Sequence, residues 1–233
     1  MHTAVIGSYV VSVYGDAPSG RLLLLLCGHE AAKLVVGNPC SDSLEEIIEK
    51  ITYLNIISLE ETSSLMDVQM LRRCVDIIKK AGVVYLFGMG ASLVAAKDAY
   101  LKFLRLNKLC VINEDWHSQL VQARNATAND VAIVISYSGA TVEAIECMKA
   151  LREKKTPIIA ITRFVQSPVS EMADYKLYTA ANESVFRSGA MSSRLSQLNI
   201  IDILYTALAN DTYEQTLEQL SRTHIHKPGS SIG

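Results

Sequence analysis

The fold of this chain is decided by the stretch Asp130-Val-Ala-Ile-Val-Ile-Ser-Tyr-Ser-Gly-Ala-Thr141. Its continuous apolar run, Val131–Ile135, is typical of a strand that is buried on both faces of a sheet. The residues that follow are rich in hydroxyl groups and small side chains, and from Thr141 to Lys154 we predict a helix. A strand that passes through a short turn into a helix is the repeating unit of parallel α/β sheets.

The same alternation continues on both sides of this stretch. Short apolar runs predict further strands at Val83–Phe87, Leu109–Ile112, Ile158–Ile161 and Tyr175–Tyr178. Helices are predicted between them, one ending near Leu106 and another beginning at Asp115 or Trp116. Apolar strands that alternate with helices indicate a parallel sheet that is covered on both faces. We therefore expect an α/β fold with a doubly wound, five-stranded parallel sheet.

Helices are predicted outside the sheet as well. Ser43–Glu60 has apolar residues at i, i+3, i+4 and i+7 and begins with the S-x-x-E pattern of a capping box. A second helix follows Asp67 and ends near Gly82. Met191–Leu208 is apolar nearly all round, so we expect it to be buried on several sides, partly in the core and partly against another subunit.

These segments predict four regions along the chain. They are an unassigned segment at 1–40, with a strand-like run at Val5–Val13 and a turn at Asp16–Gly20, a helical extension at 41–82, a binding domain at 83–210, and a C-terminal helix with a polar tail at 211–233.

Composition excludes several classes of protein. Of the 233 residues, 49% are hydrophobic and 20% are charged, which excludes global disorder. The net charge of −2 argues against a chain built to coat nucleic acid or an anionic membrane. The five cysteines form no C-x-x-C pair or metal-spaced cluster, so we expect reduced thiols, several of them in the core, and no metal site. No segment approaches the roughly 18 apolar residues that span a bilayer, and we expect a soluble cytoplasmic protein.

The strongest local motif is Ser136–Thr141. It lies where a predicted parallel strand ends and a helix begins, and ligands of such sheets bind beyond the carboxyl ends of the strands. Unpaired N–H groups of the first helical turn favour an anion, the hydroxyls of Ser136, Ser138 and Thr141 add donors, and Gly139 permits a close backbone approach. These donors could bind a phosphate monoester without the help of a Lys or Arg side chain. The alternative is that Ser136 or Ser138 only caps the helix.

Gly88-Met-Gly-Ala-Ser92 is a second candidate, again between a strand and a helix. It matches the first part of the dinucleotide fingerprint G-x-G-x-x-G, but Leu occupies position 93. Glu114 lies near where a ribose-binding acid would be, which leaves a nicotinamide or flavin site open. Alternatively, Gly90 permits a close backbone approach and Ser92 is a further phosphate donor.

Two further segments hold residues that could act in chemistry. Glu183 could bind sugar hydroxyls or act as an acid or base, and Arg187 could pair with a carboxylate or a phosphate. An ordinary surface loop is the simpler interpretation of both. His117 is a candidate acid or base. No nucleophile elbow or His partner supports a serine nucleophile, and we predict no catalytic residue.

Together these motifs resemble the SIS (sugar isomerase) domain, and most closely that of the RpiR-type (MurR/RpiR) transcriptional regulators. The resemblance covers about residues 41–210 and rests on Gly88–Ser92, Asp130–Glu143, Ile159–Thr162 with Ser167-Pro168, Ala173-Asp174, and Glu183–Arg194 with Ile201–Leu204. The helix at Ser43–Glu60 resembles the segment that links the two domains of these regulators.

The resemblance implies a flavodoxin-like sheet that binds a phosphorylated sugar and forms a homodimer or a higher homo-oligomer, without a cofactor. It implies that Ser92, Ser136, Ser138 and Thr141 hold the phosphate and that Glu183 lies near the sugar. RpiR-type regulators also carry an N-terminal helix-turn-helix domain, and residues 1–40 show neither its three-helix periodicity nor its basic residues. We expect DNA to be a partner only of a longer form, this chain being a truncated regulator, an isolated effector domain or the product of a misplaced start.

Three functions follow from these observations. The first is a phosphosugar sensor of a transcriptional regulator. The second is a sugar-phosphate isomerase or lyase, with Glu183 and His117 as its acid and base. The third is a nicotinamide-dependent oxidoreductase that uses Gly88 and Gly90. The sequence favours the sensor.

Overall fold

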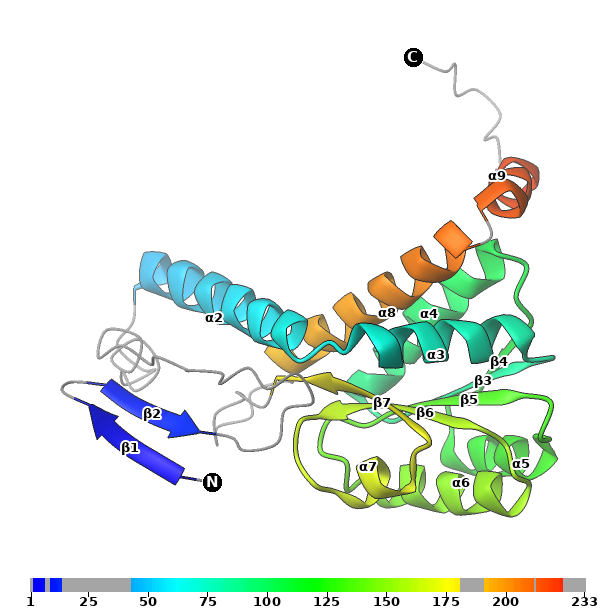
Figure 1. The fold of residues 1–233 in the computed structure, drawn as a ribbon, viewed down its shortest axis with the longest axis horizontal. Coiled ribbons are helices and arrows are strands. Elements are labelled where there is room, and N and C mark those ends of the chain that lie inside the picture. The colour runs from blue at the N-terminus through cyan, green and yellow to red at the C-terminus, as the bar shows by residue number, and fades with distance from the viewer. Residues whose placement is uncertain (1, 7–8, 14–42, 181–190, 212, 224–233) are drawn as a thin grey trace. The chain divides into compact units, whose positions relative to one another are not determined.

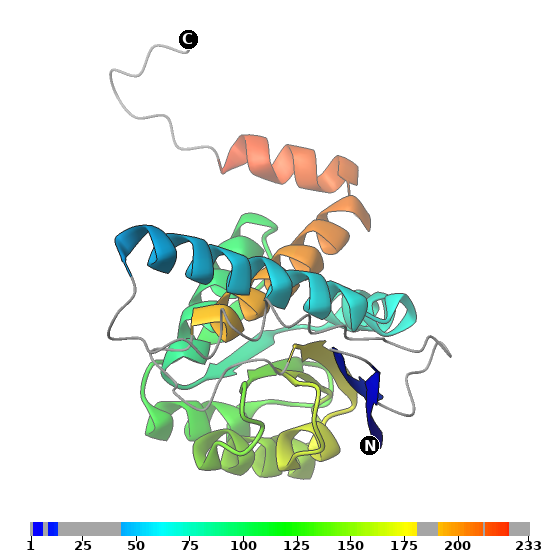
Figure 2. The same ribbon diagram turned by 90° about the vertical axis from the view of Figure 1, so that its left-hand side faces the viewer.

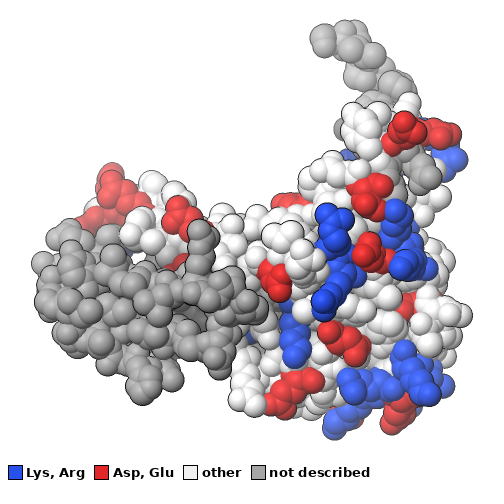
Figure 3. Space-filling view, in the orientation of Figure 1, with Lys and Arg blue, Asp and Glu red and all other residues white. Residues whose placement is uncertain are grey.

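The computed structural model describes residues 2–6, 9–13, 43–180, 191–211 and 213–223 (Figure 1). The chain divides into two compact units, residues 1–57 and residues 58–233. On the described surface, Lys and Arg side chains are interspersed with Asp and Glu (Figure 3). No described helix combines the length and the hydrophobicity that crossing a membrane requires.

The second unit holds a five-stranded parallel sheet. Its strands are β3 (Val84–Gly88), β4 (Cys110–Ile112), β5 (Val131–Ile135), β6 (Ile158–Arg163) and β7 (Tyr175–Thr179). Their order in the sheet is β4-β3-β5-β6-β7, and every pairing is parallel. β3 and β4, the first two strands of this sheet along the chain, are thus in reversed order at one edge of the sheet, which is the flavodoxin-like order. The predicted fold class is confirmed.

Helices cover both faces of this sheet (Figures 1 and 2). One layer contains α3 (Val68–Lys80), α4 (Ala91–Arg105) and α8 (Met191–Asp211), and the other contains α5 (Trp116–Asn125), α6 (Val142–Glu153) and α7 (Pro168–Met172). Side chains of β5 alternate between the two layers: Ile133 and Ile135 belong to the core cluster under α3, α4 and α8, whereas Ala132 and Val134 belong to the cluster under α6. Because both faces are covered, every residue of β5 is buried, which explains its uninterrupted apolar run.

The long apolar helix α8 is buried on several sides, as predicted. It packs against α3, α4 and β7, and Ile200, Ile201 and Leu204 are fully buried. The predicted packing of this helix against a second subunit remains a prediction. A further helix, α9 (Tyr213–Arg222), follows it, where the sequence predicts a C-terminal helix.

The helix α2 (Leu44–Ser64) begins where the sequence predicts it. Ser43 N–H donates to Glu46 Oε2 at 2.7 Å, and Glu46 N–H donates to Ser43 Oγ at 3.2 Å, so the capping box is present. The apolar residues of its first turns are exposed, Leu44 by 74% and Ile48 by 66%. The buried residues of this helix are instead Ser58 and Thr62.

The N-terminal segment, which the sequence left unassigned, contains a pair of antiparallel strands. They are β1 (His2–Ile6) and β2 (Tyr9–Val13), with Ile6 opposite Tyr9, and they include the strand-like run noted at Val5–Val13. The predicted turn at Asp16–Gly20 lies outside the described residues.

Two substitutions of leucine by alanine test the packing of the sheet. Leu86 is fully buried in β3, and Leu86→Ala is expected to lower the free energy of unfolding by about 2–5 kcal/mol because it leaves a cavity. Leu109, which is 61% exposed, is the matched control, and Leu109→Ala is expected to change the free energy by less than about 0.5 kcal/mol. Urea unfolding followed by circular dichroism measures both, and equal losses would contradict the described core.

Candidate functional site

The two loops that the sequence singles out leave the sheet side by side. β3 and β5 are neighbours, and Gly88 at the end of β3 lies opposite Ile135 at the end of β5. The strand order reverses between these two strands, and in open α/β sheets a ligand binds in the crevice beyond such a switch point. The segments Gly88–Ser92 and Ser136–Thr141 therefore begin at the same level of the same edge.

Three hydroxyl groups form a cluster beyond β5. Ser136 Oγ lies 2.9 Å from Thr141 Oγ1, and Ser138 Oγ lies 3.4 Å from the same atom. Thr141 occupies the N-cap position of α6, yet its side chain makes no capping hydrogen bond. The sequence left open whether Ser136 or Ser138 caps this helix, and neither residue is at the cap position. The hydroxyl cluster (Ser136, Ser138, Thr141) thus lies at a helix start whose first N–H groups receive no side-chain cap.

Gly139 shapes the loop that carries the hydroxyl cluster. Its φ is +66°, a conformation that L-residues with a side chain rarely adopt. A Cβ at this position would lie 2.1 Å from Ser167 Oγ. Val169 N–H donates to Gly139 O at 3.1 Å, so the start of α7 packs directly on the glycine backbone. Glycine is required here both for conformation and for space.

The loop after β3 has similar constraints. Gly90 has a φ of +56° and occupies the N-cap position of α4, where no side chain can cap the helix. A Cβ on Gly88 would lie 2.8 Å from the carbonyl oxygen of Ser92. Ser92 is nearly buried, and its Oγ accepts a hydrogen bond from Gln197 Nε2 at 3.1 Å. Ser92 is thereby tied to α8.

Two buried glutamines support the site and escaped the sequence prediction. Gln119 of α5 accepts from Gly88 N–H at 3.3 Å and donates to Gly88 O and to Asn113 O, each at 3.0 Å. Gln197 of α8 is 1% exposed and positions Ser92. Gln197 is one of several polar residues in α8, so the sequence gives no signal that singles it out. The surroundings of Gln119 in the sequence give no such signal either.

The other candidates lie elsewhere or outside the described residues. His117 is exposed and lines a cavity of about 400 Å³ between α5 and the edge strand β4. Glu114 is 75% exposed and forms a surface ion pair with Lys97 at 2.7 Å. Glu183 and Arg187 lie outside the described residues.

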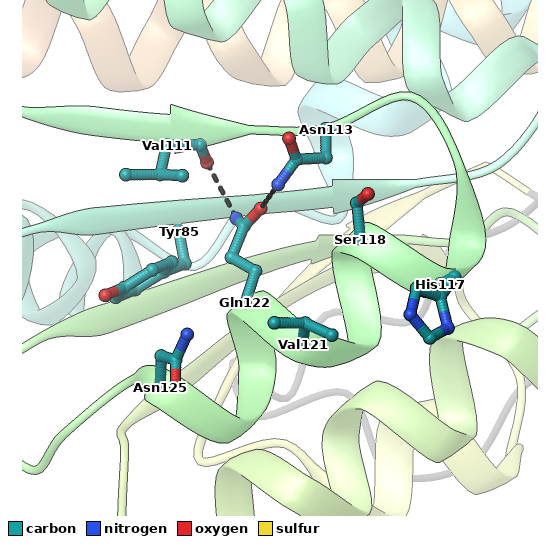
Figure 4. A pocket seen from close by; sticks show the side chains of 8 residues that line it. All are labelled: Tyr85, Val111, Asn113, His117, Ser118, Val121, Gln122 and Asn125. Atoms are coloured by element: carbon teal, nitrogen blue, oxygen red, sulfur yellow. Dashed lines mark hydrogen bonds between the residues drawn. The ribbon is translucent and has the colours of Figure 1, made fainter.

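The cavity beside α5 is distinct from the hydroxyl cluster. Its lining residues are Tyr85, Val111, Asn113, His117, Ser118, Val121, Gln122 and Asn125, and none belongs to the loops beyond β3 and β5. Figure 4 shows the Gln122 amide between Val111 and Asn113; its Nε2 donates to Val111 O at 2.9 Å, and its Oε1 accepts from Asn113. The Gln122 side chain therefore already has a hydrogen-bond partner at both its nitrogen and its oxygen.

The described titratable groups supply no metal centre and no reactive thiol. No group of three His, Cys, Asp or Glu side chains among the described residues could hold a metal ion. Burial raises the pKa of Cys74 and of Cys110 to about 12 and that of Cys147 to about 11, so all three are thiols at neutral pH. Cys74 and Cys147 are buried core residues, as predicted. Cys27 and Cys40 lie outside the described residues.

These features define a class: a doubly wound α/β domain in which two helices begin side by side at the switch point of the sheet. The SIS domain family model matches residues 77–207, and the chain belongs to this family. It is 36% identical over 194 residues to an uncharacterized HTH-type transcriptional regulator of Caldanaerobacter subterraneus subsp. tengcongensis, covering 83% of this chain and 69% of the relative. It is 40% identical over 183 residues to the uncharacterized HTH-type transcriptional regulator YbbH of Bacillus subtilis, covering 78% and 65%. The chain thus spans about two thirds of these relatives.

Solved structures share the fold. The Vibrio vulnificus NanR protein complexed with ManNAc-6P matches with a TM-score of 0.72 at 23% identity, covering 83% of this chain and 70% of that one. The sugar isomerase domain of an RpiR transcription factor from Sphaerobacter thermophilus matches with a TM-score of 0.69 at 19% identity, covering 76% and 97%. At these identities the likeness concerns the fold.

Substitution of the two positive-φ glycines tests the backbone of the site. Gly90→Ala is expected to cost about 1–3 kcal/mol of unfolding free energy, because its backbone conformation (φ +56°, ψ −124°) is unfavourable for a residue with a side chain, whereas a Cβ meets nothing within 4 Å. Gly139→Ala is expected to cost more, because the Cβ also collides with Ser167. Urea unfolding of both variants gives the comparison. An equal or smaller loss for Gly139→Ala would contradict the described packing of α7 on this loop.

Proposed function

We propose that this chain binds a phosphorylated sugar as the effector-sensing domain of an RpiR-type transcriptional regulator. The observation that carries the proposal is the hydroxyl cluster at the uncapped N-terminus of α6, beside the second loop that holds Ser92. The family supports it, since the relatives described above are named transcriptional regulators and one structural neighbour is complexed with ManNAc-6P. As in such regulators, we infer that the protein works in the cytoplasm and that DNA is a partner of the regulator as a whole.

The phosphate would be held by neutral donors. Within the part of the chain that the structure describes, Ser136, Ser138 and Thr141 bond to one another or to nearby backbone, so each can turn its hydroxyl toward an anion. The unpaired N–H groups of α6 and their dipole favour the same negative charge. Ser92 adds a hydroxyl from the neighbouring loop. We propose Gly90 and Gly139 as the residues that let the backbone approach the phosphate, and Glu183 as a sugar-binding residue.

Binding at this site can be transmitted to the helices that flank the sheet. Ser92 is hydrogen-bonded to Gln197 of α8, and Ser196 Oγ of α8 donates to Ser58 O of α2 at 3.3 Å. Thr62 of α2 also accepts from Ala180 N–H at the end of β7, at 3.0 Å. A ligand that draws on Ser92 therefore acts on a hydrogen-bonded series that reaches α2, the helix that resembles the interdomain linker. We propose that the ligand shifts this series between two arrangements, as an effector must.

A sugar-phosphate isomerase is the competing function, and the fold alone permits it. It needs an acid and a base within reach of the bound sugar. His117, one of its two candidates, lines the separate cavity beside α5. We therefore propose binding without turnover, and incubation of the protein with any phosphosugar that binds, followed by product analysis, separates the two functions.

Two conservative substitutions test the phosphate site. Ser138→Ala and Thr141→Val each remove one hydrogen bond to a charged group, which is expected to cost about 1.5–3 kcal/mol of binding free energy, or about 10- to 150-fold in Kd. Isothermal titration against a panel of sugar phosphates, with the free sugars and NAD(P) as controls, measures the effect. Ser118→Ala, at the start of α5, is the matched control and is expected to bind normally. Normal binding by both cluster variants, with loss in Ser118→Ala, would move the site to the cavity beside α5.

We also propose that the chain forms a homodimer or a higher homo-oligomer through α8 and the adjacent α4. Exposed apolar side chains follow one another along α4, with Val94 48%, Leu101 60% and Leu104 53% exposed. Light scattering at micromolar concentration is expected to give at least a dimer, and the double variant Leu101→Lys, Leu104→Lys is expected to be monomeric. Val142→Lys, on α6 in the opposite layer, is the control that keeps the oligomer. A monomeric wild-type chain would contradict this proposal.

A further inference from the structure

Two polar side chains end the strands next to the hydroxyl cluster. Arg163 is the last residue of β6, Thr179 is the last residue of β7, and the parallel register places them opposite one another. Ile161 and Leu177, two positions earlier on the same strands, are buried in the core under α8. Because side chains alternate along a strand, Arg163 and Thr179 lie on that same face, just beyond the core.

Each of these residues has one buried side-chain polar atom without a hydrogen-bond partner in the described part of the chain. Thr179 is fully buried, and its Oγ1 has no partner there. The buried Nε of Arg163 has none either. The ion pairs among the described residues do not include Arg163. A buried donor without an acceptor is costly, so two of them on facing residues indicate a place where an acceptor binds.

The backbone and the ring of Tyr137 hold Arg163 beside the loop that carries the hydroxyl cluster. Arg163 N–H donates to Tyr137 O at 3.2 Å, and the Arg163 Cζ lies 6.0 Å from the centroid of the Tyr137 ring. Tyr137 is itself flanked by Ser136 and Ser138 of the hydroxyl cluster. The guanidinium thus lies one strand away from the neutral phosphate donors, with an aromatic ring to fix its position.

The side of the sheet that Arg163 and Thr179 face is polar beyond the core. It includes the buried Ser193 and Gln197 of α8, and Thr62 of α2 bonds to the residue that follows Thr179. A sugar anchored by its phosphate at the hydroxyl cluster would therefore reach toward Arg163 with its other end.

We infer that Arg163, with Thr179, recognises a carboxylate on the ligand, so that the effector is a phosphorylated sugar acid. The phosphate has neutral donors of its own, whereas a guanidinium offers a planar fork of N–H groups and a full positive charge that match a carboxylate. Thr179 Oγ1 supplies an additional hydroxyl donor next to it. This inference rests on the proposed phosphosugar site and adds a second, charged determinant of specificity to it.

The test compares acids with matched neutral sugars by isothermal titration. Two pairs are used: 6-phosphogluconate with glucose 6-phosphate, and galacturonate 1-phosphate with galactose 1-phosphate. We expect the wild-type chain to bind the acid of at least one pair tenfold or more tightly than the neutral sugar. Arg163→Gln is expected to abolish this preference and to leave the affinity for the neutral sugar within twofold. Arg152→Gln, an exposed arginine that donates to Met172 O, is the control that keeps the preference.

Two further variants keep the test independent of folding. Arg163→Lys retains the charge without the fork and is expected to keep only part of the preference. Thr179→Val removes a hydroxyl without a described partner, so it is expected to leave the melting temperature of the free protein unchanged or higher and to weaken only acid binding.

The outcomes separate this inference from the proposed function. Equal binding of acids and neutral sugars by the wild-type chain would overturn the role of Arg163 and leave the phosphate site intact, and so would an equal loss for both in Arg163→Gln. A chain that binds no phosphosugar of either pair or of the wider panel would overturn both proposals. Loss of both classes in Ser138→Ala, with loss of the acid preference alone in Arg163→Gln, is the expected pattern.

Discussion

The parallel pairing of β3 with β5 is the constraint on which the candidate site depends. Gly88 and Ile135 are register partners, so the two following loops begin at one level and their helices, α4 and α6, start side by side. Each helix start lacks a side-chain cap, and in α4 the N–H groups of Ser92 and Leu93 donate instead to Met89 O and Gly90 O. A slip of the register by one residue would separate the loops and turn every core side chain of the strand to the opposite face.

Close backbone packing fixes the two loops in place. Ser167, just before α7, lies so close to Gly139 that a Cβ at position 139 would collide with it. The buried Gln119 side chain holds Gly88 by hydrogen bonds to both its N–H and its C=O. A site of neutral hydroxyls needs such support, because each donor contributes little unless its direction is set in advance. The chain places its polar support inside the core and leaves the hydroxyl groups at the edge bonded mainly to each other.

Much of the fold was predictable from the sequence, because each prediction used a local pattern. Continuous apolar runs mark the strands β5 and β6 whatever their neighbours are, and the six residues from Ser136 to Thr141 combine hydroxyls with a glycine in a spacing that needs no tertiary information. The strand-like run at Val5–Val13 gave no assignment for its segment, since an apolar run does not reveal that the chain reverses within it. The roles of Ser92, Ser136, Ser138 and Thr141 remain predictions, although the structure describes where each of them lies.

The sequence by itself therefore determined the class of fold, the five strands and the hydroxyl motif, because apolar periodicity and local turn chemistry act between residues that are close in the chain. The tertiary structure decided which distant residues support the motif. Gln197 is 105 positions from the Ser92 that it contacts, and Arg163 meets Thr179 through the register of two strands. Such contacts follow from strand order and from helix packing across the sheet, and neither is encoded in the residues immediately around the site.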